Sequence, residues 1–137
     1  MKQILIPIAL SLVLLFAGAK ESAALPGDLL HTFNNPAPAP SDEFGISVAG
    51  VGNNVLIGAY PDNTGANNAG SAYLYGTTGA PLHTFNNSAP ASDDFFGQSV
   101  AGVGNNVLVG AYADDTGADN TGSAYLFEGS QQAQVPN

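Results

Sequence analysis

The chain has 137 residues, of which 11 are Asp or Glu and only 2 are Lys or Arg, so its formal net charge is −9; it contains no cysteine. A chain without cysteine has no disulfide framework, and packing and hydrogen bonds must hold its fold. Such an acidic chain cannot neutralise phosphate groups, which argues against nucleic acids and anionic membranes as partners and favours cations.

The N-terminus begins with Met1 and Lys2 and continues as an apolar run up to Ala19. A positive start, a short apolar stretch and small residues after it predict a secretory signal peptide over residues 1–24, cleaved after Ala19 or after Ala24. A membrane anchor is disfavoured, because the run is shorter than the roughly 20 residues that span a bilayer. We therefore expect a secreted, extracellular or cell-surface protein with no stable membrane insertion after cleavage.

The rest of the sequence repeats itself with an offset of 52 residues. Residues 30–75 align with residues 82–127 without a gap, and 35 of the 46 positions are identical. A fixed period of this length indicates a repeat architecture. We assign repeat 1 to residues 25–76, repeat 2 to residues 77–128 and a polar tail to residues 129–137.

Each repeat unit contains four strand-like runs separated by turn residues. The second run is apolar almost without alternation, which indicates a strand covered on both faces. Its glycines, Gly58 and Gly110, are expected to lie where a neighbouring strand or sheet leaves no room for a side chain. No window after the signal peptide has a helical stripe. The first set of four runs spans residues 45–51, 54–60, 71–75 and 81–85.

Three motifs recur in both copies: Phe-Gly-x-Ser-Val-Ala, Val-Leu-Ile/Val-Gly-Ala-Tyr and Gly-Ser-Ala-Tyr-Leu-aromatic. Together they resemble the FG-GAP repeat, a family that includes bacterial secreted repeat proteins and the integrin α head. The resemblance implies one four-stranded blade per repeat, with the first strand innermost. We thus expect an all-β fold of two four-stranded antiparallel propeller-type blades, a partial β-propeller. The integrin-type calcium loop is not carried over, because Gly52–Asn53–Asn54 has no carboxylate.

Two blades are fewer than the four to eight with which propellers typically close. The sequence also begins with a spare outer strand, residues 29–33, and ends without the outer strand of its second blade. Three explanations remain open. Several chains close a ring by lending the first strand to a neighbour, the chain is a piece of a longer repeat protein, or the two units form a small sandwich.

Eight of the ten acids after residue 24 fall in the loops that follow the second run or precede the first, so they should share one face. Calcium prefers six to eight oxygen ligands, and this face offers two candidate sets. The alternative is that these residues form Asx turns with their own backbone. The acids before Phe44 and Phe96 are expected to be solvated. The stronger calcium set is Asp114, Asp115, Asp119 and Asn120; the weaker is Asp62, Asn63, Asn67 and Asn68.

The sequence favours a binding or scaffold protein that acts through this acidic face on an extracellular protein or glycan. Catalysis is not expected: His31 and His83 share one repeat position, which indicates a structural role, and no serine lies in a nucleophile elbow. The alternatives are a polysaccharide hydrolase using paired loop carboxylates and an inactive fragment of a longer repeat protein. No cofactor is expected apart from calcium.

Overall fold

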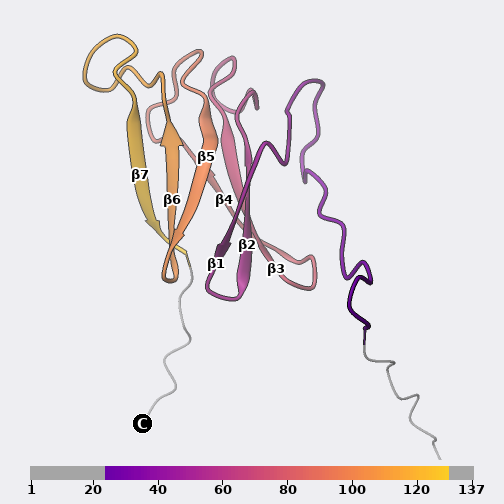
Figure 1. Ribbon diagram of the computed structural model, residues 1–137. Helices are drawn as coiled ribbons and strands as arrows, with labels where there is room; N and C mark the ends of the chain where they lie inside the picture. Colours follow the sequence, from indigo (N-terminus) through magenta and orange to yellow (C-terminus); the bar gives the residue numbers. More distant parts are fainter. Residues whose placement is uncertain (1–23, 130–137) are drawn as a thin grey trace, which may run out of the picture. The chain divides into compact units, whose positions relative to one another are not determined.

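The computed structural model describes residues 24–129, so residues 1–23 of the expected signal peptide and residues 130–137 of the tail lie outside the described residues. The described chain is all-β and contains no helix, which confirms the expected fold class (Figure 1). Its seven strands are β1 (Ser47–Val51), β2 (Asn54–Ala59), β3 (Ser71–Gly76), β4 (Pro81–Asn86), β5 (Phe96–Val103), β6 (Asn106–Ala111) and β7 (Ser123–Glu128).

The strands form two antiparallel sheets, each in sequence order. The first sheet is β1-β2-β3-β4 and the second sheet is β5-β6-β7. Their registers repeat with the sequence: Leu56 faces Leu74 in the first sheet, and Leu108 faces Leu126 in the second. Two-residue turns join β1 to β2 and β5 to β6, and Gly52 enters its turn with a φ of 56°. A positive φ at this position suits a tight hairpin, and glycine adopts it without strain.

The expected leading strand at residues 29–33 is not formed, which corrects the sequence-based expectation. A strand needs a neighbour for its backbone hydrogen bonds, and no sheet precedes this segment among the described residues. Phe33 nevertheless packs on Tyr75, with the ring centroids 5.3 Å apart. Among the described residues, the second sheet consists of β5, β6 and β7.

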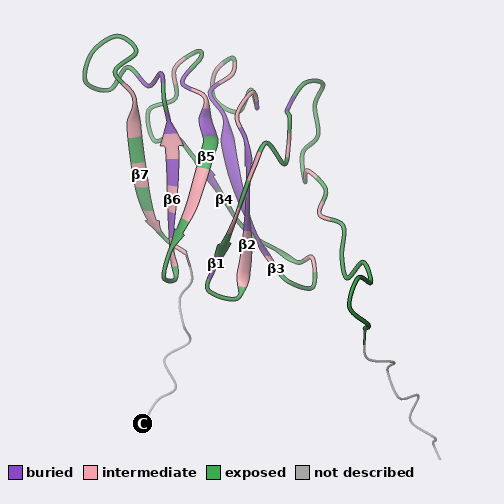
Figure 2. Ribbon diagram, viewed as in Figure 1, coloured by how far each residue is buried: buried purple, intermediate pink, exposed green. Residues whose placement is uncertain are grey.

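Each sheet has two apolar faces. We define the front face by Ile57 and Tyr73 in the first sheet and by their repeat counterparts in the second, and the back face by Leu56 and Leu74 and their counterparts. The back face of the first sheet packs on the front face of the second and forms the main core (Figure 2). Since β2 is covered on both faces, its sequence is apolar from Val55 to Ala59. The buried members of this core are Val51, Leu56, Ala72, Leu74, Phe85, Phe96, Val107, Val109 and Ala111.

The two sheets approach each other closely at a glycine of β2. A Cβ on Gly58 would lie 1.9 Å from the carbonyl oxygen of Gly97 and 2.3 Å from Ser47 Oγ. Ser47 Oγ donates a hydrogen bond of 2.7 Å to the same carbonyl. The predicted lack of room is therefore confirmed at Gly58. At Gly110 the only atom closer than 3 Å is Ser99 Oγ, at 2.3 Å, and a rotatable hydroxyl can move away.

We expect Gly58→Ala to lower the free energy of unfolding by about 1–3 kcal/mol, because the new methyl group meets backbone rather than a movable side chain. Gly76→Ala is the matched control: its nearest neighbour lies at 3.8 Å, so its effect should stay within about 1 kcal/mol. Urea unfolding of both variants gives the comparison. Equal losses would show that the sheets do not meet at Gly58.

Candidate functional site: the loop face

The loops that follow β2 and β6 and those that precede β1 and β5 lie at one end of the strands, opposite the two-residue turns (Figure 1). We call this surface the loop face; it consists of residues 34–46, 60–70, 87–95 and 112–122. It holds eight of the ten acids that follow residue 24. The sequence-based sorting of the acids is consistent with this arrangement of loops.

In the second repeat, a buried amide joins two carboxylates beneath the loop face. Asn87 Nδ2 donates hydrogen bonds of 2.8 Å to Asp94 and 2.9 Å to Asp114. Tyr125 on β7 donates its hydroxyl proton to the same Asp114 oxygen. Asp94 and Asp114 are each only 1% exposed. These groups thus connect two loops and a strand of the second repeat.

The first repeat has the corresponding residues, with fewer hydrogen bonds between them. Asn35 Nδ2 donates to Asp42 at 2.8 Å, and Tyr73 donates its hydroxyl proton to Asp62 at 2.5 Å. The sequence analysis missed this network, although an Asn and an Asp seven residues apart occur in both copies. That repeated spacing was the signal that could have revealed it.

The expectation that the acids before Phe44 and Phe96 are solvated is wrong for one acid of each pair. Asp42 is 5% and Asp94 is 1% exposed, whereas Glu43 and Asp93 are exposed. The Oδ2 atom of each buried carboxylate accepts hydrogen bonds from an asparagine amide and from the backbone N–H of Ala39 or Ala91, which offsets part of the cost of burial. The Oδ1 atoms of Asp42 and Asp94 are buried and have no hydrogen-bond partner among the described residues.

The two aspartates that follow β2 and β6 form Asx turns. Asp62 Oδ1 accepts the backbone N–H of Thr64 at 2.8 Å, and Asp114 Oδ1 accepts that of Thr116 at 2.7 Å. Such bonds fix the start of each loop by satisfying its own backbone. Both carboxylate oxygens of Asp114 accept hydrogen bonds, since its Oδ2 accepts the side chains of Asn87 and Tyr125.

The remaining members of the calcium sets lie nearer the surface. In the stronger set, Asp115, Asp119 and Asn120 are exposed, and Asp115 Oδ1 accepts the backbone N–H of Asn120. Across residues 24–129, no group of three or more acidic or histidine side chains is placed to hold a metal ion. The calcium site stays a prediction, and its accessible carboxylates are Asp115 and Asp119.

The weaker calcium set is tied to its own loop and to the loop before β5. Asn63 Oδ1 accepts the backbone N–H of Asn68 at 2.8 Å. Asn68 Nδ2 donates to Asp93 Oδ1 at 2.7 Å, and the carbonyl of Asn67 accepts the backbone N–H of Asp93 at 2.9 Å. These residues join two loops of the loop face.

An aromatic row crosses the loop face, and the sequence analysis did not foresee it. Phe95 lies between two tyrosines: its ring centroid is 5.5 Å from that of Tyr60 and 5.1 Å from that of Tyr112, with which it is stacked. Tyr112 is 56% exposed. The negative charge of Glu43, followed by burial, raises the pKa of the Tyr60 hydroxyl above its ordinary value.

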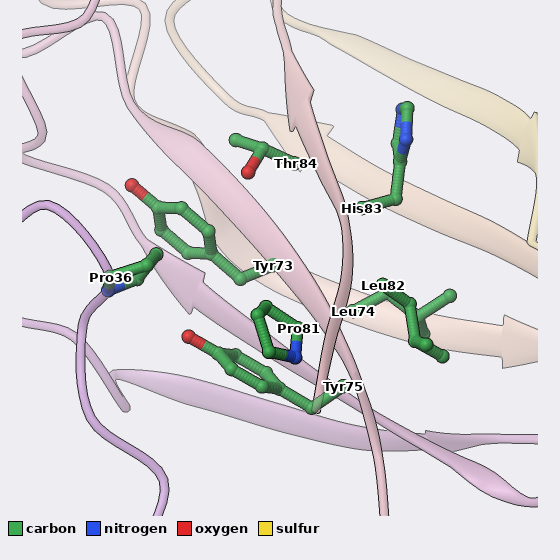
Figure 3. Close-up of a pocket in the computed structure, with 8 residues that line it drawn as sticks. All are labelled: Pro36, Tyr73, Leu74, Tyr75, Pro81, Leu82, His83 and Thr84. Atoms are coloured by element: carbon green, nitrogen blue, oxygen red, sulfur yellow. The ribbon is translucent and has the colours of Figure 1, made fainter. Parts of the chain in front are cut away.

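A hollow of about 340 Å³ opens on the front face of the first sheet between Pro36 and strands β3 and β4. Figure 3 shows Tyr73 and Tyr75 with their hydroxyl groups directed to the side of Pro36, and His83 on the other side of β4. The Tyr75 hydroxyl donates to the Asn34 carbonyl at 2.8 Å, and that of Tyr73 to Asp62. Polar and apolar groups contribute about equally to the surface of the hollow.

The repeat motifs and the two sheets agree with a comparison against known families. Residues 37–75 and 87–127 each match the FG-GAP repeat. The chain belongs to the FG-GAP repeat family. No curated protein matches it closely enough to be reported as a relative.

FG-GAP repeats form β-propeller-like proteins and are typical of extracellular or surface proteins. Within residues 24–129, the protein has no helix of the length and apolarity needed to cross a bilayer.

The calcium prediction is tested by thermal unfolding in calcium, in magnesium and in sodium chloride of matched ionic strength. A folded-state site adds about 2.7 kcal/mol when calcium reaches 100 times its dissociation constant. We expect Asp115→Asn/Asp119→Asn to remove the calcium-specific gain. The control Glu43→Gln/Asp93→Asn removes two charges from the same face and should keep it. If magnesium and sodium reproduce the whole gain, there is no site.

The Asp114 network predicts a dependence of stability on pH. Burial opposes ionisation of Asp114, but hydrogen bonds from Thr116, Tyr125 and Asn87 outweigh it and hold the pKa of this carboxyl below its ordinary value. A lowered pKa stabilises the fold above the ordinary value of about 4, and this contribution disappears as the pH falls through the folded-state pKa.

We therefore expect Asp114→Asn to be less stable than wild type at neutral pH and to lose less stability on acidification. Asp119→Asn removes the same charge from an exposed side chain and should keep the wild-type acid response. Urea unfolding across the acidic range measures both. Parallel curves for wild type and Asp114→Asn would contradict the prediction.

Proposed function

We propose that this FG-GAP repeat protein is a secreted or surface-associated binding protein whose loop face takes an extracellular protein segment rich in Lys or Arg. The observation that supports it most is the aromatic row of Tyr60, Phe95 and Tyr112 beside uncompensated acids. Aromatic rings attract Lys and Arg side chains through cation–π contacts. Exposed tyrosine is also a frequent source of binding energy at protein interfaces.

The charge of the loop face supports a basic partner. Residues 24–129 contain no Lys or Arg, so no basic side chain of that part of the chain pairs with the acids. A surface of one charge sign steers oppositely charged partners and accelerates their association. The exposed acids available for this role are Glu43, Asp93, Asp115 and Asp119.

Backbone hydrogen bonds make the centre of the loop face well suited to binding. The N–H groups of Asp93, Phe95 and Phe96 donate to the carbonyls of residues 67, 68 and 69, at 2.9–3.1 Å. This ladder fixes Phe95 to the loop that follows Tyr60. A preorganised surface loses less entropy when a partner binds.

The burial of Asp94 and Asp114 favours binding over the alternative of polysaccharide hydrolysis. A glycosidase needs two carboxylates that reach the substrate from opposite sides. These two are joined by Asn87 and are each 1% exposed, so a sugar ring has no access to them in this arrangement.

The proposal is tested by binding of a fluorescent Lys/Arg-rich peptide, with a neutral peptide and a neutral polysaccharide as comparison probes. We expect binding that weakens with salt, and a loss of about tenfold, or ~1.4 kcal/mol, in Tyr112→Ala. Leu82→Ala is the matched control, because this leucine is 51% exposed on β4, outside the loop face. Preference for the polysaccharide, or its cleavage, or equal effects of both variants, would overturn the proposal.

A further inference from the structure

The contact between the two sheets shows what covers the back face of a repeat. On the back face of the first sheet, Val51, Leu56 and Leu74 are at most 1% exposed, because they share a core with the front face of the second sheet. Phe96 is a buried member of this core, and the next carbonyl, that of Gly97, fits against Gly58. The Phe-Gly pair of one repeat thus inserts against the strand glycine of the preceding repeat.

The back face of the second sheet has matching residues, and no sheet covers them in the described part of the chain. Val103 and Leu126, the counterparts of Val51 and Leu74, are 50% and 61% exposed. A hollow of about 130 Å³ lies on this face, with Leu108, Gly110 and Ala124 in its lining. Around the matching residues of the first sheet, this space is taken by Phe96 and Gly97. The hollow is therefore suited to a second Phe-Gly pair.

The front face of the first sheet offers that pair. Phe44, which precedes Gly45, is only partly buried. Val48 is 65% exposed, whereas its counterpart Val100 packs against the main core. No atom lies within 4 Å of a Cβ built on Gly50, whereas the same position on Gly102 is 2.0 Å from a carbonyl oxygen of the other sheet. The front face of the first sheet thus has the residues of an inter-sheet contact, but no sheet packs on it within residues 24–129.

Residues 31–34 contact the first sheet in the same way as β4, the last strand of the first sheet, contacts the second sheet. The ring centroids of Phe33 and Tyr75 are 5.3 Å apart, and those of their counterparts Phe85 and Phe127 are 5.0 Å apart. This segment pairs with no strand among the described residues. β7 is the outermost strand of the second sheet in the described part of the chain, so its outer edge also has no strand partner there.

We propose that copies of this chain associate head to tail, with the back face of the second sheet of one copy on the front face of the first sheet of the next. Phe44 and Gly45 enter the hollow at Gly110, and residues 31–34 pair with β7. The repeat sets the register: Ser123 faces Asn34, and Ala124 faces Phe33. This register copies the pairing of β3 with β4 inside the first sheet, where Ser71 faces Asn86 and Ala72 faces Phe85.

Complementarity favours this orientation over contacts between identical faces. Two front faces would bring two Phe-Gly pairs together, and two back faces would bring two hollows together. Only the head-to-tail contact reproduces the packing inside the chain. A heterologous contact of this kind generates a ring when its rotation closes and a filament when it does not. The inference does not depend on the ligand of the loop face.

Light scattering of the purified protein at micromolar concentration tests the association. We expect a mass of several chains for wild type and a monomer for Leu126→Asp, which places a charge in the contact. Ile46→Asp is the control: Ile46 is 49% exposed, and its counterpart Gln98 remains exposed beside the internal contact. This variant should assemble and melt as wild type does. A monomeric wild type, or an assembled Leu126→Asp, would overturn the proposal.

Cross-linking tests the orientation and does not depend on the folding of Leu126→Asp. The chain has no cysteine, so Asn34→Cys and Ser123→Cys each introduce one thiol. In their counterparts, Ser71 Oγ donates a hydrogen bond of 2.9 Å to Asn86 Oδ1, so the two side chains are adjacent. When the two variants are mixed and oxidised, a disulfide should form between one copy of each variant. Neither variant should form a disulfide-linked dimer when it is oxidised alone. Self-cross-linking, or equal cross-linking of Asn34→Cys with Glu128→Cys, would contradict the head-to-tail register.

Discussion

The approach of the Gly97 carbonyl to Gly58 sets the distance between the two sheets, and the main core depends on that distance. No larger residue fits at Gly58, and Ser47 fixes the same carbonyl by a hydrogen bond of 2.7 Å. Leu56, Leu74 and Val109 then fill the space between the sheets and are at most 1% exposed. Each such side chain contributes about 1.5–3 kcal/mol when buried. Residues 24–129 have no Lys or Arg to pair with an acid, so apolar contact and hydrogen bonding hold the fold.

The same packing builds the loop face. Because the two sheets repeat one another with an offset of 52 residues, their corresponding loops emerge at the same end. Phe95 immediately precedes Phe96 of the core, so the residue that anchors the sheets also positions the centre of the aromatic row. The buried Asn87 network connects the loops below this row. The conformation of the exposed acids therefore depends on core and network residues that a partner would not touch.

Most of the fold followed from the sequence because the repeat and the strand periodicity are strong local signals. The run at residues 54–60 predicted β2 to within one residue, and its unbroken apolar character predicted the covered faces. The segment at residues 29–33 resembles β4 in sequence, but local similarity cannot supply the sheet with which a strand pairs. The burial of Asp94 was missed for a related reason. Its hydrogen-bond partner Asn87 is seven residues away, and only the folded loop brings the two together.

The central claim is that the contact between the sheets makes the two repeats one cooperative unit rather than two independent hairpin assemblies. Repeat proteins gain stability from the interfaces between neighbouring units as well as from each unit. Amide hydrogen exchange resolved along the chain tests this claim most directly. The account predicts that amides of β2, β3 and β6 share the slowest exchange and that Gly58→Ala accelerates all three strands together. Faster exchange in β6 alone, with β2 and β3 unchanged, would contradict it.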